Sequence, residues 1–430
     1  MLPSKSTFKN FWVSIIGLLL FKLLIDLMYV IYICPKHNNR GFTYEPSTLS
    51  MFFSWGSLLL VLPFLINFFE SKNVSSKILT FWVLISFVPT TSIFGFLNVE
   101  FLLWELFIVY WLVLLVVMRL LEKVNLPSIP HRIVAYRTII LGVITILLSS
   151  VVLFVSAYYF KFRFSLNIDQ VTDVRTSFKS VTIPTIFHYL LPTAGTILPI
   201  MLLYYLAKRK YIVGVLLLFV LLIDFSIAGN RAIIIKIAVC IFGYFAYKWI
   251  KSKYFSWYFS VAILSSLLVY FTTDLTILSS LIRRALFIPG MLNLHYFEFF
   301  SHHSPDFYQQ GIIGAITGNT SQYPISIATI IGDQFMGVGA GNNANNGLFS
   351  DAISNFGLYF LFVQAILVAI YLKLFDWASQ SIDEKYAFLP AFIVAQTLLS
   401  ALITTSMLTH GLLILLLVLL LLPTKEMEKK

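Results

Sequence analysis

Residues 11–33 read FWVSIIGLLLFKLLIDLMYVIYI, an apolar run interrupted only by Lys22 and Asp26. A helix needs roughly 20 such residues to cross the hydrocarbon core of a bilayer. The run is longer than the core of a signal peptide, which has about 7–15 residues, and it lacks a small-residue cleavage site, so it predicts a retained transmembrane helix. Lys22 and Asp26 lie four residues apart on one helix face, where we expect them to neutralise each other.

Outward from this run, the rest of the chain repeats the pattern. Its 430 residues are 59% hydrophobic and 11% charged, with a mean hydropathy of +0.88, which is far from the composition of a soluble domain. Further apolar runs lie at about 51–69, 78–97, 100–121, 136–160, 182–207, 211–229, 231–250, 254–274, 350–372, 386–404 and 408–422. The last two are nearly continuous and could instead form one bent helix and a re-entrant piece. The sequence predicts an all-α, polytopic transmembrane bundle of about 12 spans, with residues 1–430 as a single transmembrane domain.

The basic residues indicate the orientation of the bundle. When the N-terminus is placed in the cytoplasm, about two thirds of the lysines and arginines fall at the inner ends of the spans, as the positive-inside rule requires. An even number of spans then leaves both termini cytoplasmic. The formal charge of +11 is explained by this topology, so the expected partner is the lipid bilayer and not nucleic acid.

Two expected outer segments, residues 161–181 and 273–350, are long enough to carry function. The aromatic content of the second predicts that it is ordered, and its amphipathic stretch from Leu281 to Phe300 could lie along the membrane interface. Six of the ten arginines fall on the outer side, where the planar guanidinium can bind carboxylate or phosphate oxygens through two hydrogen bonds. Each arginine alone could instead anchor a lipid headgroup or form a loop ion pair, as Arg175 would with Asp169 or Asp173.

Several ionisable residues lie inside the predicted spans, where a charge is costly. Glu105, His188, Asp224 and Lys236 have no partner nearby in the sequence, so we expect each to face the bundle interior or a wet cavity. Asp224 is followed by Gly229-Asn230-Arg231 at the outer end of its helix. Asp224 and Arg231 could line one cavity, or Asp224 could form a structural pair with Arg231 or Lys236.

The segment 273–350 concentrates groups that suit glycosyl chemistry. Arg283 and Arg284 are adjacent cations at its start, and a histidine near a carboxylate, as in His295 and Glu298, can remove a proton from a hydroxyl. His302 and His303 lack the matching cysteine or aspartate of a metal site, so we expect no metal and no cofactor. The segment ends in a run of asparagine and glycine, residues 341–347, whose amides can donate to and accept from sugar hydroxyls.

Three stretches together resemble the bacterial O-antigen or capsular repeat-unit polymerases, the Wzy type. They are Gly229-Asn230-Arg231, the segment from Arg283-Arg284 to Pro289-Gly290, and residues 342–351 with Asn355-Phe356-Gly357. The resemblance also covers the topology, with two long outer loops after the fifth and ninth spans.

The resemblance implies a metal-independent membrane glycosyltransferase of a GT-C-like class in the bacterial cytoplasmic membrane. Its substrate would be an undecaprenyl-diphosphate-linked oligosaccharide, polymerised at the outer leaflet, and a chain-length regulator would be a further partner. Arginines would stabilise the diphosphate leaving group in place of a metal. An O-antigen ligase, or a non-enzymatic flippase or transporter of lipid-linked oligosaccharides, remains an alternative.

The expected roles fall on eleven residues. The diphosphate would be bound by Arg231, Arg283 and Arg284, and the general base would be one of His302, His295, Glu298 and Asp351. The sugars would be bound by Asn342, Asn343, Asn345 and Asn346.

Overall fold

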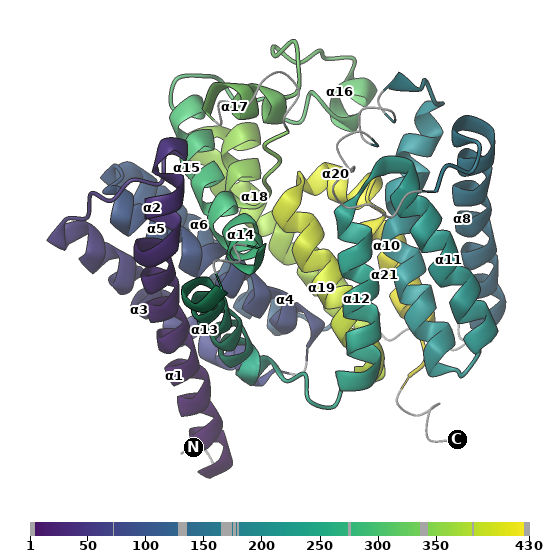
Figure 1. Ribbon diagram of the computed structural model, residues 1–430, viewed down its shortest axis with the longest axis horizontal. Coiled ribbons are helices and arrows are strands. Elements are labelled where there is room, and N and C mark those ends of the chain that lie inside the picture. The colour runs from purple at the N-terminus through teal and green to yellow at the C-terminus, as the bar shows by residue number, and fades with distance from the viewer. Residues whose placement is uncertain are drawn as a thin grey trace. The chain divides into compact units, whose positions relative to one another are not determined.

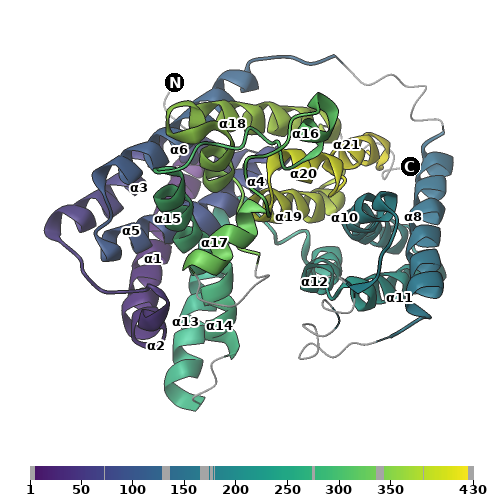
Figure 2. The same cartoon turned by 90° about the horizontal axis from the view of Figure 1, so that it is seen from above.

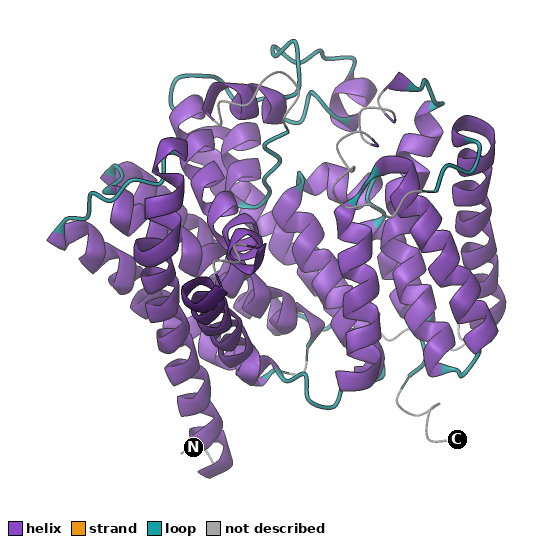
Figure 3. Cartoon of the chain, viewed as in Figure 1, coloured by secondary structure: helices purple, strands orange, loops and turns teal. Residues whose placement is uncertain are grey.

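The fold is known from a computed structural model, which describes residues 5–71, 73–127, 136–164, 174, 178, 180–273, 277–335, 343–380 and 382–424. These residues form helices joined by short connections (Figures 1 and 3). In this part of the chain, the one β pairing is an isolated bridge between Ile382 and Thr424. The all-α class expected from the sequence is therefore confirmed.

Nine helical segments of the described chain are long and apolar enough to cross a membrane, as expected of a multi-pass membrane protein. They are Phe11–Arg40, Thr48–Ile66, Val74–Leu97, Phe101–Glu122, Arg137–Phe160, Thr185–Ala207, Tyr211–Ala228, Ser252–Thr273 and Phe349–Ser379. The other three expected spans are the shorter helices α12 (Arg231–Ala246), α19 (Glu384–Ser400) and α21 (Leu412–Leu421). Because α12 is only about 24 Å long at 1.5 Å per residue, twelve crossings stay a prediction.

The described chain forms two compact units. Unit 1 comprises residues 1–124, 251–373 and 398–404, and unit 2 comprises residues 125–250, 374–397 and 405–430. Whether the two act as the single transmembrane domain expected for residues 1–430 stays a prediction. Most of the expected outer segment 161–181, including Arg175, lies outside the described residues.

Unit 1 holds the N-terminal helices and the long segment that precedes α18. Its helices are α1 (Lys5–Met28), η1 (Tyr29–Ile33), α2 (Cys34–His37), η2 (Asn38–Arg40), α3 (Thr48–Glu70), α4 (Val74–Trp82), η3 (Val83–Phe87), α5 (Val88–Leu97), α6 (Phe101–Glu122), η4 (Ser252–Tyr254), α13 (Phe255–Thr273), α14 (Ile277–Ile282), η5 (Arg283–Phe287), α15 (Ile288–Phe300), α16 (Ile312–Thr317), α17 (Ile327–Phe335) and most of α18 (Phe349–Ser379). Helix α1 packs on α13, α5 and α3. Aromatic rings fill the interior, where Phe87 stacks on Phe107 with centroids 5.8 Å apart.

Unit 2 is arranged around α10 (Thr185–Ala207), whose residues 193–204 are all buried. Helices α8 (Arg137–Phe160), α11 (Tyr211–Ala228), α12 and α21 pack against it (Figure 2). Pro192 and Pro199 lie inside α10. Because proline has no N–H, each one frees the carbonyl four residues earlier in the helix. Helix α20 (Ile403–Leu408) is divided between the units by its contacts.

Three π-helical turns interrupt the helices of unit 1, and each one ends two residues before a proline. The prolines are Pro35 after η1, Pro89 after η3 and Pro289 after η5. At η5 the N–H of Ile288 donates to the carbonyl of Arg283, five residues earlier. Because the next residue has no N–H to continue the α ladder, the wider turn is accommodated there. Turns of this kind are frequent at functional sites.

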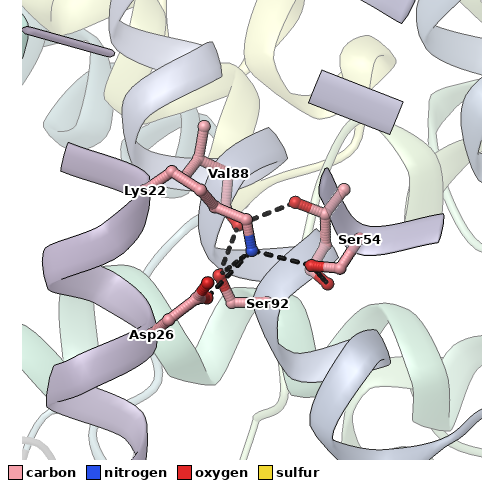
Figure 4. A network of polar contacts seen from close by, with 6 residues as sticks. Lys22, Asp26, Ser54, Val88 and Ser92 are labelled. Atoms are coloured by element: carbon pink, nitrogen blue, oxygen red, sulfur yellow. Dashed lines mark hydrogen bonds and ion pairs between the residues drawn. The ribbon is translucent and has the colours of Figure 1, made fainter. Parts of the chain in front are cut away.

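The expected pair inside the first span is confirmed. The Lys22 ammonium is fully buried and donates to Asp26 Oδ1 at 2.9 Å and to the hydroxyls of Ser54 and Ser92 at 2.7 Å each (Figure 4). The ammonium therefore uses its three N–H donors on α1, α3 and α5. This network ties three membrane helices together.

Two of the four isolated ionisable residues are buried and two are not. Asp224 and Lys236 are buried in unit 2, where Lys236 Nζ donates at 3.1 Å to the Gly195 carbonyl that Pro199 leaves free. Glu105 and His188 are exposed, so neither faces the packed interior, and the expected wet cavity stays a prediction. Both lie in the first two turns of their helices, close enough to the end to avoid the interior.

The described part of segment 273–350 is folded against α18 and its neighbours. Asp306 N donates to the Ser354 carbonyl at 2.8 Å, and Tyr308 N donates to Asn355 Oδ1 at 2.8 Å. Gly290 lets α15 approach α5, because a Cβ there would lie 2.6 Å from Ile93 Cδ1. Nine of the 13 residues of α15 are buried, on all sides of the helix, so most of the stretch Leu281–Phe300 is packed into unit 1 and does not present an apolar face to a membrane interface.

Candidate functional site

Positive charges gather in unit 1 where two distant segments meet. Lys36, His37 and Arg40 belong to α2 and η2, and Arg283 and Arg284 open η5. The charges of Arg283, Arg40 and Lys36 all act on the His37 ring, and those of Arg40 and Arg284 act on Arg283. We call these five residues the cation cluster. Lysine and arginine give it four permanent positive charges.

The proline-associated π turns position both halves of the cluster. Pro35 opens α2 directly after η1, and Gly41, with φ +85°, ends η2 in a left-handed conformation that favours glycine. On the other side, Pro289 follows η5, and the close packing at Gly290 holds this helix on α5. Each half of the cluster therefore lies beside a proline and a glycine that fix the local course of the backbone.

The described structure provides no anion for these charges. Arg40, Arg283 and Arg284 form no ion pair with described residues, and Glu45, the nearest acid in the sequence, does not pair with them. The Arg283 Nε and His37 Nε2 atoms are buried and have no hydrogen-bond partner in the described chain. Burial, and next the charge of Arg40, lowers the pKa of Arg283. Because neighbouring positive charges repel one another, we expect the cluster to bind an anionic ligand.

Aromatic rings border the cluster. Lys36 Nζ lies 6.0 Å from the centre of the Tyr270 ring, and Tyr32 packs edge-on against both Tyr270 and His37. A cation over an aromatic face is favourable and leaves the ammonium hydrogens free for a ligand. The site thus combines cations with a partly apolar wall.

The third arginine expected to bind the diphosphate belongs to unit 2. Arg231 is the first residue of α12, and the Asn230 side chain caps this helix by accepting a hydrogen bond from Ala232 N at 3.1 Å. Arg283 and Arg284 belong to unit 1. A shared role for Arg231, Arg283 and Arg284 stays a prediction.

Among the candidate bases, His295 and Glu298 are paired as the sequence suggested. His295 Nδ1 lies 3.1 Å from Glu298 Oε2, and the ring stacks on Phe335 at 4.7 Å. His302 is exposed, whereas His303 stacks on Phe299 at 3.9 Å. A carboxylate that orients an imidazole is a common arrangement for a general base. However, His295 is twelve residues from Arg283, roughly 18 Å along a helix.

Asp351 has a different environment from that of an exposed base. It is fully buried, and Oδ1 accepts from Asn355 Nδ2 at 2.9 Å. Oδ2 accepts from Gln364 Nε2 at 3.1 Å and from Ile403 N at 2.8 Å. Tyr110 donates in turn to Gln364 Oε1 at 2.7 Å. With donors on both oxygens, this carboxylate is better suited to holding α18 than to accepting a proton from substrate.

The asparagines expected to bind sugar are not equivalent. Asn346 is buried, and its Nδ2 lies 2.9 Å from Asn293 Oδ1, 3.0 Å from the Pro289 carbonyl and 2.8 Å from Ser350 Oγ, so its amide group connects the start of α15 to α18. Asn343 is exposed and accepts from Thr329 Oγ1 at 2.9 Å. Asn345 is exposed, and Asn342 lies outside the described residues. Of the three described asparagines, Asn346 is the one whose amide nitrogen is already hydrogen-bonded within the protein.

Sequence reasoning missed Lys36, His37 and Arg40 as site residues. The signal was the run Cys34-Pro35-Lys36-His37-Asn38-Asn39-Arg40, which places basic residues directly after a span on the side expected to be poor in them. Nothing in that run points to Arg283, which is more than two hundred residues further along the chain. Their meeting is a tertiary feature.

The described residues contain no group of three or more histidine, cysteine, aspartate or glutamate side chains placed to hold a metal ion. No protein-family model, no curated protein and no solved structure matches this chain.

Proposed function

We propose that this protein is a membrane glycosyltransferase that polymerises undecaprenyl-diphosphate-linked oligosaccharide repeat units at the outer leaflet of a bacterial cytoplasmic membrane. The observation that carries the proposal is the cation cluster, with its unpaired charges and the unpartnered Arg283 Nε. A lipid diphosphate has the charge and the planar oxygen geometry that clustered arginines bind best. The apolar helices support the bilayer as the site of action.

The reaction needs one bond to form and one to break. A sugar hydroxyl oxygen of the acceptor attacks the anomeric carbon of the donor, and the bond from that carbon to the diphosphate oxygen breaks. The electron pair leaves with the diphosphate, and a base takes the hydroxyl proton. Arg283, Arg284 and Arg40 stabilise the negative charge that develops on the leaving group.

Two residues fit the role of base. His295, oriented by Glu298, has the better hydrogen-bonded geometry, but the helix carries it away from the arginines. His37 lies within the cation cluster, and its Nε2 is buried and unpartnered. The base takes its proton from the acceptor hydroxyl, and we propose one of these two residues for that role.

Reconstitution tests the proposal directly. The purified protein in lipid nanodiscs is incubated with lipid-linked repeat units, isolated from cells of the source organism that lack this gene, and the products are resolved by length. We expect a ladder of lipid-linked polymer, which persists in the presence of EDTA. Well-folded protein that leaves the units single would refute the proposal.

A second candidate, a flippase for the same lipid-linked substrate, is favoured by one observation. Asp224 and Lys236 are buried in unit 2 beside α10, a continuous helix with two prolines inside it, and ionisable residues within membrane segments often mark a transport path. Fluorescent lipid-linked oligosaccharide in proteoliposomes distinguishes the two. Transfer between leaflets without polymer formation would favour the flippase.

A further inference from the structure

Residues between α15 and α17 surround a surface hollow of about 780 Å³. The hollow is shallow and largely open to solvent. Its polar side chains are amides and hydroxyls, from Gln309, Gln310, Asn319, Thr320, Ser321, Tyr323 and Ser326. None of the lining residues is charged.

A buried carboxylate, that of Asp306, links residues on the two walls of the hollow. Asp306, only 2% exposed, accepts a hydrogen bond from Gln310 N at 2.9 Å and another from the Ser321 hydroxyl. These two residues lie on opposite sides of α16 in the sequence, so Asp306 joins both walls. Asp306 N also donates to the Ser354 carbonyl at 2.8 Å, which attaches the hollow to α18.

Further contacts keep the walls in place. Gln310 Nε2 donates to the Ile325 carbonyl at 2.6 Å, and Gln310 Oε1 accepts from Ile327 N at 3.0 Å. At Gly314, helix α16 lies directly against the backbone of Gln309, because a Cβ there would lie 2.0 Å from the Gln309 carbonyl oxygen. A site whose walls are already ordered loses less entropy when it binds a ligand.

Three lining side chains are left available to a ligand. Gln309, Asn319 and Thr320 form no side-chain hydrogen bond to the described residues. Each primary amide offers two N–H donors and a carbonyl acceptor, and the hydroxyl offers one donor and two acceptor positions. These donors and acceptors match those of a ligand rich in hydroxyl groups.

We propose that this hollow binds the uncharged sugars of the lipid-linked repeat unit; the inference rests on the proposed function and adds a site for the oligosaccharide. The absence of a charged lining residue disfavours a phosphate or carboxylate ligand, which would need a cation. The ring of Tyr323, which packs near Phe299 and Phe300, adds an aromatic surface for the C–H face of a sugar.

The place of the hollow in unit 1 fits an elongated substrate. Helix α15 separates it from Arg283, and the 13 residues of that helix rise about 20 Å. A diphosphate at the cation cluster and a sugar several residues further along the same oligosaccharide could therefore be bound together. The asparagines of residues 342–346 are not needed for this contact.

The test uses the oligosaccharide without its lipid. Mild acid releases the free repeat unit from the lipid diphosphate, and its binding to the full-length protein in nanodiscs is measured by titration calorimetry. Asn319→Ala and Gln309→Ala should each weaken binding about tenfold, the loss expected for one or two hydrogen bonds. Gln334→Ala is the matched control, because this exposed amide lies in the same segment and does not line the hollow, whereas Asn345→Ala tests the asparagine run.

The outcomes separate this inference from the proposed function. Equal binding by all variants, or no binding of the free repeat unit while polymer is still made, would overturn the sugar site and leave the polymerase intact. Selective weakening by the two lining variants would support the site even if no polymer were formed. A larger loss in Asn345→Ala than in Asn319→Ala would place the sugars on the asparagine run instead.

Discussion

Arg283 differs from its neighbour Arg284 in a way that sequence alone does not show. Arg283 is half-buried with an unpartnered Nε, whereas Arg284 is exposed. Lysine keeps the charge but has neither the planar fork nor the Nε donor. Replacing each arginine by lysine therefore compares a residue that we expect to donate a directed hydrogen bond, Arg283, with one that we expect to act through its charge, Arg284.

We expect Arg283→Lys to slow polymerisation by about a hundred- to a thousandfold, the usual effect of removing one transition-state donor. Arg284→Lys should be close to wild type, because an exposed cation acts mainly through its charge. The measurement is the initial rate of polymer formation in nanodiscs at matched protein concentration. Equal rates for both variants would mean that Arg283 contributes charge alone.

The Lys22 network gives a prediction about stability. Asp26→Ala leaves the buried ammonium with two serine hydroxyls and no counter-charge, so it should lower the free energy of unfolding by about 3–5 kcal/mol. Lys22→Met with Asp26→Ala should recover most of that loss, because the unpaired charge is gone. Denaturant titration of the purified protein measures both. A double variant as unstable as Asp26→Ala would show that the pair acts through packing.

Among elements, the π turn at η5 carries the arginines of the site. Pro289 cannot donate to the Ala285 carbonyl, so the turn widens and the helix before it is rotated relative to α15. The same sequence feature recurs at Pro35, on the other side of the cation cluster. Both prolines therefore set the direction of basic side chains without touching a ligand.

Pro289→Ala restores a backbone donor and should allow a continuous α-helix, which rotates Arg283 by about 100° for each residue absorbed. We expect weaker binding of inorganic pyrophosphate, with thermal stability unchanged or higher. Pro63→Ala in α3 is the control, because that proline lies inside a helix outside the cluster. Pyrophosphate affinity that is equal in wild type and Pro289→Ala would show that the π turn does not orient the arginines.

At the scale of the whole molecule, the prediction concerns the orientation of the chain across the membrane. The positive-inside count predicts that Gln309 faces outward and that Lys251 faces the cytoplasm. In a background with Cys34 and Cys240 replaced, which removes the two free thiols, Gln309→Cys should react with an impermeant maleimide in intact cells. Lys251→Cys should react only after permeabilisation. Labelling of Lys251→Cys alone would invert the topology and exclude transfer at the outer leaflet.

The sequence by itself determined the helical class and the position of the membrane segments. In a bilayer every backbone polar group must be satisfied within the segment, so long apolar runs can only be helices. The Lys22 and Asp26 pair was equally local, because i and i+4 residues lie on one helix face. The boundaries of the nine long helical segments agree with the runs of apolar residues to within a few residues, with two exceptions: α2 and η2 extend the first segment to Arg40, and α18 continues to Ser379, beyond the predicted end at residue 372.

Only the tertiary structure decided which polar residues are free to act. Asn346 and Asp351 look like site residues in the sequence, yet contacts from distant helices occupy their polar atoms. Conversely, Lys36, His37 and Arg40 join Arg283 because two proline-associated turns meet in unit 1. Hydrogen bonding and charge depend on distance in space, and local patterns carry no information about contacts between segments so far apart in the chain.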